Sequence, residues 1–205
     1  MVRLRPATIA DVDSIGEVLA DAFLDDPGAV IFEPERDRRA EILPAFFRTW
    51  VAAALADGGD LVVPDQPGPP RGVASWFGPD RHGPSGDAMA AAGMADVLEA
   101  FGPAAADRML AMVSALEREH DRLAPGPHLR LDFFGVRPDA QGTGLGTSLL
   151  EHGHARGDRE RLPCYLETFT RRNVEYYERR GWDVVERYTV ADAVPVYAMI
   201  RPVGD

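Results

Sequence analysis

Three alternating glycines follow a predicted strand and precede a predicted helix, an arrangement that favours binding of a phosphate. Gly142, Gly144 and Gly146 lie within residues 136–150, just after an apolar strand that ends at Val136. Glycine has no Cβ, so the backbone can adopt positive φ and a ligand can approach it closely. The helix that follows begins with unpaired N–H donors and the positive end of its dipole. We therefore expect a phosphorylated ligand at this turn.

Spacing separates the phosphate loops that could fit this segment. The nucleoside-triphosphate loop requires a lysine after its last glycine, and this chain contains no lysine. The dinucleotide fingerprint G-x-G-x-x-G would place its third glycine at Thr147. Glu167 lies at the distance expected of a ribose-binding acid, but fewer than half the strands of a doubly wound sheet could follow the loop. A tight turn that binds no ligand would also need flexible residues.

A third phosphate-binding pattern matches, and a second block supports it. The pattern R/Q-x-x-G-x-G/A is met by Gln141, Gly144 and Gly146. Residues 166–182, LETFTRRNVEYYERRGW, match the pattern L-E-T-x-x-x-x-N-x-x-x-Y-E-x-x-G-F/W. The two blocks together resemble the GNAT superfamily of acyl-CoA-dependent N-acyltransferases. The resemblance is strongest over residues 128–188.

The resemblance implies acetyl-CoA as co-substrate, bound mainly by main-chain groups. Phe134, Gly135 and Val136 would bind the pantetheine arm, and the glycine loop would bind the pyrophosphate. The loop residues are Gln141, Gly142, Thr143, Gly144, Leu145, Gly146 and Thr147. Gln141 is uncharged where many relatives have arginine, so the helix end and an arginine must meet the phosphate charge. The candidates for that arginine are Arg171, Arg172 and Arg180.

Asn173 and Tyr177 lie four residues apart on a predicted helix and therefore share one face. The resemblance implies a cofactor-binding asparagine and a general-acid tyrosine at these positions. A phenol with a pKa of ~10 can donate a proton to a thiolate whose conjugate acid has a pKa of ~8.5. Tyr176 projects about 100° away and is the alternative acid. Tyr177 could instead only pack its helix, with its hydroxyl bonded to the backbone.

A base is also required, because alkyl ammonium groups titrate at a pKa of ~10 and must lose a proton before attack. Asp132, on the strand before the loop, and Glu167, near the end of the next strand, are the candidates. Acids on strand faces are more often solvated or paired, and water chains are a further alternative. Asp25 and Asp26 follow the first predicted helix, where the resemblance implies the acceptor wall. Helix capping or turn chemistry explains this pair equally well.

Covalent and metal chemistry are not expected. Cys164 stands in an apolar strand with no adjacent histidine, so no acyl-enzyme is predicted. His152 and His154 lie two apart on a helix and face different directions, a poor geometry for a metal pair. The acetyl group is therefore expected to pass directly from acetyl-CoA to the amine in a ternary complex.

The elements that position these residues alternate between strands and helices, which predicts an α/β fold. Apolar alternation predicts strands over residues 2–5, 61–63, 72–77, 128–136, 164–169, 182–190 and 194–200. Helical spacing predicts helices over residues 8–24, 42–54, 88–101, 104–123, 145–157 and 171–180. The resemblance implies a mostly antiparallel GNAT-like sheet, flanked by helices and splayed at a central V-shaped cleft between its fourth and fifth strands.

Two local features of these elements are predicted as well. Pro44 is expected to kink or to start the second helix. Alternation along residues 128–136 predicts two faces. One face carries Leu129, Leu131 and Phe133, and the other carries Arg130, Asp132 and Phe134.

Composition excludes several classes of partner. The formal net charge is −11 and all 22 basic residues are arginine, which argues against nucleic acid. No apolar run approaches the ~20 residues that span a bilayer, so no membrane partner is expected. The start lacks an apolar secretory segment and the chain has a single cysteine, which predicts a cytoplasmic location. The acidic charge could attract cationic amines or simply solvate the surface.

The sequence therefore predicts one acetyltransferase domain over residues 1–205, with an elaborated middle region at 60–127 that matches the family only in element order. Its substrate is expected to be a small-molecule amine, and its state a monomer or homodimer. Within the superfamily, the L-E-T and N-x-x-x-Y-E-R-x-G blocks most resemble those of puromycin N-acetyltransferase-type and other bacterial members that modify antibiotics or amines. A non-catalytic acyl-CoA-binding module and a structural, partner-binding domain are the alternatives from other classes.

Overall fold

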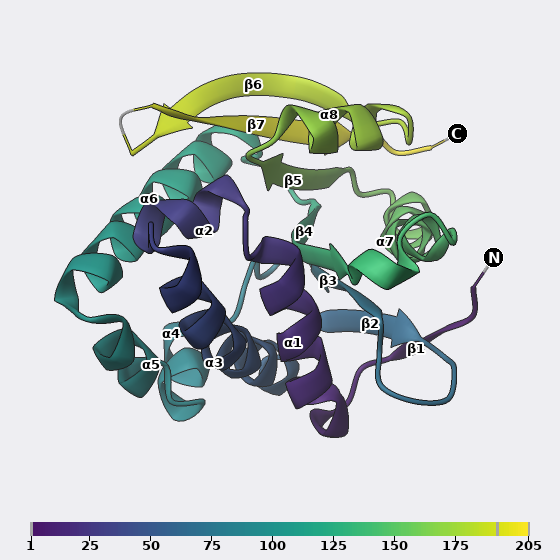
Figure 1. Ribbon diagram of the computed structural model, residues 1–205. Coiled ribbons are helices and arrows are strands. Elements are labelled where there is room, and N and C mark those ends of the chain that lie inside the picture. The colour runs from purple at the N-terminus through teal and green to yellow at the C-terminus, as the bar shows by residue number, and fades with distance from the viewer. Residues whose placement is uncertain (1, 192, 205) are drawn as a thin grey trace.

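A seven-stranded mixed sheet runs through the molecule (Figure 1). The computed structural model describes residues 2–191 and 193–204. The strand order is β1-β2-β3-β4-β5-β7-β6, and neighbouring strands are antiparallel except β4 and β5, which are parallel. The strands are β1 Leu4–Pro6, β2 Asp60–Pro64, β3 Gly72–Phe77, β4 Leu129–Val136, β5 Cys164–Thr168, β6 Asp183–Val190 and β7 Val194–Arg201. The predicted mostly antiparallel sheet with flanking helices is confirmed.

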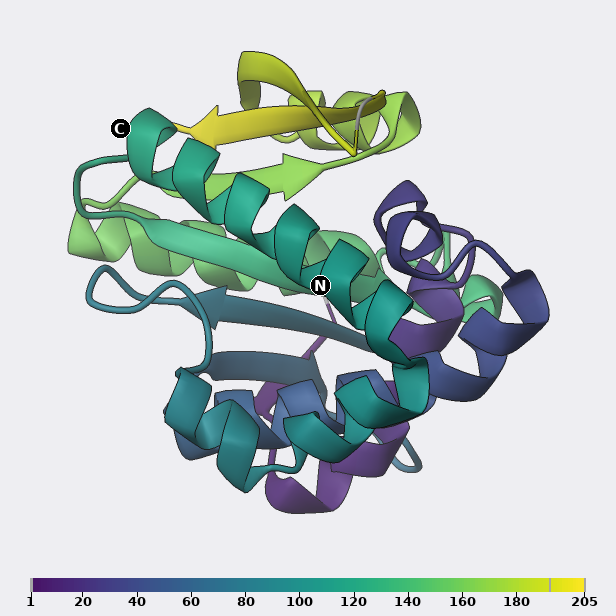
Figure 2. The same ribbon diagram turned by 90° about the vertical axis from the view of Figure 1, so that its left-hand side faces the viewer.

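Helices cover both faces of the sheet, and each face has its own apolar core. One core joins α1, α2, α3, α5 and α6 to the sheet through residues such as Leu19 and Phe47, and the other joins α7 and α8 through Leu149 and Val174. Figure 2 shows α6 running diagonally across the sheet. The helices are α1 Val12–Phe23, α2 Pro27–Phe32, α3 Arg36–Ala56, α4 Gly86–Ala91, α5 Met94–Phe101, α6 Pro103–Leu123, α7 Leu145–Glu160 and α8 Arg171–Glu178, with short 3-10 helices η1 Ile9–Asp11 and η2 Pro138–Ala140. Among the described residues, no helix combines the length and apolar character needed to cross a membrane.

The helices of the first half lie where the sequence predicts them, but three details differ. Asp26 caps the short helix α2 by accepting a hydrogen bond from the Gly28 amide at 2.8 Å, and Pro27 lies in its first turn, where a missing N–H costs nothing. Helix α3 begins at Arg36, so Pro44 lies within the helix and does not start it. Gly93, with φ of +93°, divides the predicted helix 88–101 into α4 and α5.

A β-bulge in β4 overturns the predicted strand faces. Ser75 pairs with Phe133 and Trp76 pairs with Leu131, so Asp132 is an extra residue without a partner on β3. A bulge reverses the alternation beyond it. Phe133 consequently packs in the core of α1 and α3, whereas Leu129 and Leu131 pack in the opposite core with α7. The prediction that Phe133 shares a face with these two leucines is therefore wrong. The prediction that Phe134 shares a face with Arg130 is wrong as well, because Phe134 packs in the core of the two leucines.

Gly153 allows α7 to lie close against the sheet. A Cβ added at this position would overlap the indole ring of Trp76 on β3. Trp76 is fully buried. The close approach fixes the height of α7, and therefore of the glycine loop that leads into it, above the sheet.

Candidate active site

Strands β4 and β5 separate beside the glycine loop. They pair only at Leu129–Cys164 and Arg130–Tyr165. Beyond this point β4 stays on β3 and β5 stays on β7. The main-chain groups of Phe134 to Val136 on the side away from β3 are therefore not used by β5. A split of this kind leaves hydrogen-bonding edges that an extended, amide-containing ligand can use.

The glycine loop has the geometry of an anion site. Gly142 and Gly144 have φ of +76° and +85°, and a Cβ on either would meet no atom within 4 Å. Gly144 is the N-cap of α7. Among the residues that the structure describes, no side chain caps this end, and its first turn holds no acid. The first amides of a 16-residue helix are therefore directed outward with its positive dipole end.

Gly146 is needed for a reason that the sequence did not reveal. A Cβ at Gly146 would lie 2.8 Å from the hydroxyl oxygen of Tyr176 and 3.2 Å from Cζ of Phe134. Tyr176, which the sequence suggests as the alternative acid, lies over the start of α7. Its ring stacks with that of Phe134, and the two ring centroids are 6.1 Å apart. The third glycine therefore makes room for a side chain rather than for a left-handed turn.

Two polar side chains of the glycine loop form hydrogen bonds to main-chain carbonyl groups. Nε2 of Gln141 donates to the carbonyl oxygen of Val136 at 3.2 Å, and the hydroxyl of Thr143 donates to that of Ala140 at 2.7 Å. Both bonds hold the loop to the end of β4 and to η2. Gln141 thus orders the loop main chain in this structure, which leaves the charge of an anion to the helix end and to arginine.

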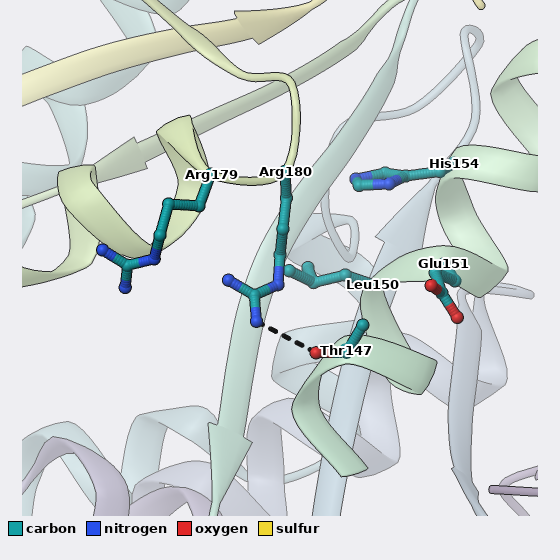
Figure 3. Close-up of a pocket in the computed structure, with 6 residues that line it drawn as sticks. All are labelled: Thr147, Leu150, Glu151, His154, Arg179 and Arg180. Atoms are coloured by element: carbon teal, nitrogen blue, oxygen red, sulfur yellow. Dashed lines mark hydrogen bonds between the residues drawn. The ribbon is translucent and has the colours of Figure 1, made fainter. Parts of the chain in front are cut away.

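Arg180 lines a pocket beside the loop (Figure 3). Its Nη2 donates to the Thr147 hydroxyl at 3.0 Å, its Nη1 donates to the Tyr176 carbonyl at 2.7 Å, and its Cζ is 3.7 Å from the Tyr176 ring centroid. The pocket has a volume of ≈ 420 Å³. Its lining residues are Thr147, Leu150, Glu151, His154, Arg179 and Arg180. Of the three arginines suggested by the sequence, Arg180 is the one bonded to the first turn of α7.

Tyr177 lies in the core beneath the split. Its side chain is 7% exposed and packs with Phe134 and Trp182. Burial raises the pKa of its phenol above the ordinary value, and the nearby charges of Tyr176 and Asp26 raise it further. Within the described residues its hydroxyl makes no hydrogen bond, so the phenol proton is free for a ligand. This differs from the alternative in which the hydroxyl is bonded to the backbone.

Asn173 and the two loop aspartates have separate environments. Asn173 donates from Nδ2 to the Thr168 hydroxyl at 3.0 Å, which ties α8 to the end of β5. Asp25 is exposed and accepts from Nε of Arg36 at 2.9 Å. Asp26 is half-buried at the start of α2, and its desolvation raises its pKa to about 6. The structure therefore brings Asp26, not Asp25, close to Tyr177.

Glu167 is held by several donors on the α6 side of the sheet. Its Oε1 accepts from the hydroxyl of Tyr165 at 2.9 Å and from the hydroxyl of Tyr188, and its Oε2 is 3.5 Å from Nη2 of Arg130. Burial raises the pKa of Glu167, while Arg130 and the two hydroxyls oppose that rise. Sequence reasoning missed both tyrosines and Arg130, because they come from three different strands.

Asp132 is less well compensated than Glu167. Arg130 donates to Glu117 at 2.7 Å, whereas its Nε lies 3.9 Å from Oδ1 of Asp132. Burial raises the pKa of Asp132 to about 6; Arg130 opposes the rise, and the charges of Glu117 and Glu167 add to it. The side chain is still 17% exposed. The bulge thus presents an accessible carboxylate whose pKa of about 6 lies close to neutral pH.

The remaining candidates have structural surroundings. Cys164 is buried, and burial raises the pKa of its thiol to about 12, which leaves no thiolate for nucleophilic attack. His152 bonds to Asp60 at 3.0 Å, and His154 lies 2.9 Å from Nε1 of Trp182. A different group, His82, His120 and His128, gathers on the α6 side of the sheet.

A sheet that splits beside glycine turns and an uncapped helix end has the architecture expected of an acyl-CoA-dependent acetyltransferase. Comparison with known proteins agrees with this class. Residues 76–182 match the model of the acetyltransferase (GNAT) family. The chain belongs to the GNAT family.

Solved structures from bacteria and from an animal share the fold. A Corynebacterium glutamicum structure described as histone acetyltransferase HPA2 and related acetyltransferase is 30% identical, with a TM-score of 0.74, covering 100% of this chain and 98% of that one. A GCN5-related N-acetyltransferase from Rhodopseudomonas palustris is 18% identical, with a TM-score of 0.59, covering 99% and 96%. A polyamine N-acetyltransferase from Drosophila melanogaster is 16% identical, with a TM-score of 0.63, covering 99% and 100%. The last two, at these identities, support the fold alone.

Proposed function

We propose that the protein transfers the acetyl group of acetyl-CoA to a primary amine of a small molecule, such as an antibiotic or another amine metabolite, by direct attack in a ternary complex. The observation that carries the proposal is the separation of β4 and β5 between an anion-binding helix end on one face and Asp132 on the other. This arrangement lets two substrates meet from opposite faces of the sheet.

The residues present fit acetyl-CoA, which supplies an activated thioester when bound. The edge of Phe134, Gly135 and Val136 that β5 does not use is suited to the amides of the pantetheine arm, although the Val136 carbonyl already accepts a bond from Gln141. The amides that follow Gly144 would bind the pyrophosphate, and Arg180 would add a positive charge beside the Thr147 end of the same helix. Asn173 supports this site by holding the end of β5.

Asp132 is the base in this proposal. With a pKa of about 6 it is mostly ionised at neutral pH, and it can still take a proton from an ammonium group directly or through a water. Glu167 contributes negative charge but is already bonded to two hydroxyls. Together with Asp26, these carboxylates favour an acceptor that arrives as a cation.

Tyr177 is the general acid in this proposal. Its raised pKa keeps the phenol protonated over the whole working range of pH, so the proton is always present to be given to the departing sulfur. Proton transfer from a weak acid requires close positioning, which packing against Phe134 and Trp182 provides. Removing the hydroxyl should therefore slow turnover more than it weakens binding.

The test is release of free thiol from acetyl-CoA across a panel of aliphatic amines, amino sugars and peptides with free N-termini. We expect release with at least one small amine, at a rate above that with the peptides. Calorimetric binding of CoA without thiol release for any acceptor would favour a regulatory acyl-CoA-binding module. Absence of CoA binding would contradict the proposal altogether.

A further inference from the structure

Three histidines that the acetyl transfer does not use meet on the α6 side of the sheet. His82 comes from the loop after β3, His120 from the last turn of α6, and His128 from the residue before β4. One ring nitrogen of each lies within 4.8 Å of the others. His120 and His128 are 1% and 2% exposed, and His82 is half-buried. Three of the chain's five histidines therefore gather at one point.

Hydrogen bonds define where the protons of this cluster lie. Nδ1 of His128 is 2.7 Å from the Gly126 carbonyl, which can only accept, so Nδ1 carries the proton and Nε2 of the neutral ring presents a lone pair. Nε2 of His120 lies 2.7 Å from Nε2 of His128 and donates a hydrogen bond to it. Nδ1 of neutral His120 then has a lone pair, 3.8 Å from the Glu117 carboxylate and without a partner among the described residues. Such a buried, unpaired acceptor is costly.

We propose that His82, His120 and His128 bind one divalent cation of the zinc type. With a cation in place, His120 would lose its Nε2 proton to solvent and take one up at Nδ1, so that Nε2 presents a lone pair to the metal. The Nδ1–H would then hydrogen-bond to the Glu117 carboxylate once their present separation of 3.8 Å closes. A histidine that binds a metal usually donates its other ring N–H to a carbonyl or carboxylate oxygen. His128 already does so, because its Nδ1–H donates to the Gly126 carbonyl. Nε2 of His82 is buried and unpartnered within the described chain, so it is free to ligate. Imidazole ligands favour Zn²⁺, Co²⁺ and Cu²⁺ over Mg²⁺ and Ca²⁺.

His120 and His128 lie close to the spacing that such an ion needs, whereas the ring of His82, which stacks on that of His128 with centroids 4.3 Å apart and planes 11° apart, must turn to direct its Nε2 at the same point. Bonds of ~2.0–2.1 Å at tetrahedral angles place two ligand nitrogens about 3.3 Å apart. The nitrogens of His120 and His128 must therefore separate by roughly 0.6 Å from their 2.7 Å hydrogen bond. A pocket of ≈ 440 Å³, lined by His82, Asp121 and Gly126 among others, opens beside the cluster and can admit a water as fourth ligand. The charge of nearby Arg130 is offset by Glu117 at 2.7 Å.

The site would join the middle region to the carboxylate of Glu167. The ring of His120 lies 4.8 Å from that of Tyr165, whose hydroxyl donates to Glu167. A metal would thus fix the loop after β3 and the end of α6 against the sheet at the acceptor side. This role is structural and does not depend on the acetyl transfer.

The test titrates Co²⁺, and then Zn²⁺, into the full chain without an affinity tag after treatment with a chelator. We expect one Co²⁺ per chain, with visible absorption bands as intense as those of four-coordinate cobalt, and displacement of the bands by Zn²⁺. Zn²⁺ should also raise the midpoint of thermal unfolding, because an ion that binds only the folded chain stabilises it.

Variants separate a metal site from a hydrogen-bonded histidine pair. His82→Ala lies in a loop, so the fold should persist by circular dichroism while Co²⁺ affinity falls by more than the ~10–100-fold typical of an outer-shell change. Glu117→Gln should lower affinity about 10–100-fold and still give the bands. His152→Ala, which removes a histidine outside the cluster, should bind like the unmodified chain. Absence of Co²⁺ bands in the unmodified chain, or equal binding by His82→Ala, would overturn the proposal.

Discussion

Replacing Asp132 by asparagine should lower activity and raise stability at the same time. The carboxylate is the proposed base, and general base catalysis contributes ~10²–10⁴-fold to rate. We expect Asp132→Asn to reduce kcat/KM for an alkyl amine by about that factor. Because a charge that Arg130 compensates only in part is removed as well, the folded state should become more stable.

The magnitude of the stability change follows from the pKa of Asp132. Burial raises it from 3.8 to about 6, so the folded chain holds a proton that the unfolded chain has lost between these two pH values. The free energy of unfolding therefore falls as pH rises through that window, by up to about 3 kcal/mol for two pKa units. Asparagine should remove this loss, and the difference between the two proteins should be present at pH 7 and absent below pH ~4.

The rate of the unmodified protein should show the same titration. At pH 7 roughly 90% of a carboxyl with a pKa of about 6 is ionised, and at pH 5 roughly 10%. For Asp132 as base, kcat/KM should fall about tenfold between pH 7 and pH 5 beyond the change caused by the amine itself. An ordinary aspartate would remain ionised over this range.

The assay measures thiol release against pH for both proteins, with thermal unfolding at each pH. An acceptor whose amine has a pKa below the assay range arrives deprotonated and does not need a base. The loss caused by Asp132→Asn should shrink with such an acceptor. Equal losses for both kinds of acceptor, or a lower unfolding midpoint at pH 7, would refute the assignment of Asp132 as the base.

Three further predictions concern the acid, the thiol and the packing of α7. Tyr177→Phe should lower kcat by at least about tenfold with little change in unfolding midpoint, because the hydroxyl makes no hydrogen bond within the described chain; an unchanged kcat would contradict its role. Cys164→Ala should retain kcat, because burial leaves no thiolate for an acyl-enzyme. Double-reciprocal plots of initial velocity for the two substrates should intersect, as a ternary complex requires. Loss of kcat in a folded Cys164→Ala protein would instead indicate an acyl-enzyme. Gly153→Ala should lower the free energy of unfolding by about 1–3 kcal/mol or more, since its Cβ overlaps Trp76. Gly86→Ala, where a Cβ meets nothing, is the control, and equal midpoints for the two would argue against that packing.

Local features of the site could be predicted from the sequence. The turn through Gly142 and Gly144, the start of α7 and the helix carrying Asn173 and Tyr177 depend on neighbouring residues and on hydrophobic period. The family resemblance added the separation between β4 and β5. The turn and the two helices depend on interactions within short stretches of chain, which sequence patterns predict well.

Long-range pairing explains what the sequence did not reveal. The bulge at Asp132 depends on how β4 aligns with β3, and the residues of β4 alone give regular alternation. The bond from Tyr188 to Glu167 joins strands that are adjacent only through β7. The histidine cluster combines a loop, a helix end and a strand start, so no spacing in the sequence marks it.

The central claim is direct transfer of an acetyl group to a small amine. Its most direct test is mass spectrometry after a single turnover with acetyl-CoA labelled in the acetyl group and with an amine found in the panel. The account predicts that the label appears on the amine nitrogen and that no label remains on the protein. Label on the protein, or label found only as free acetate, would contradict it.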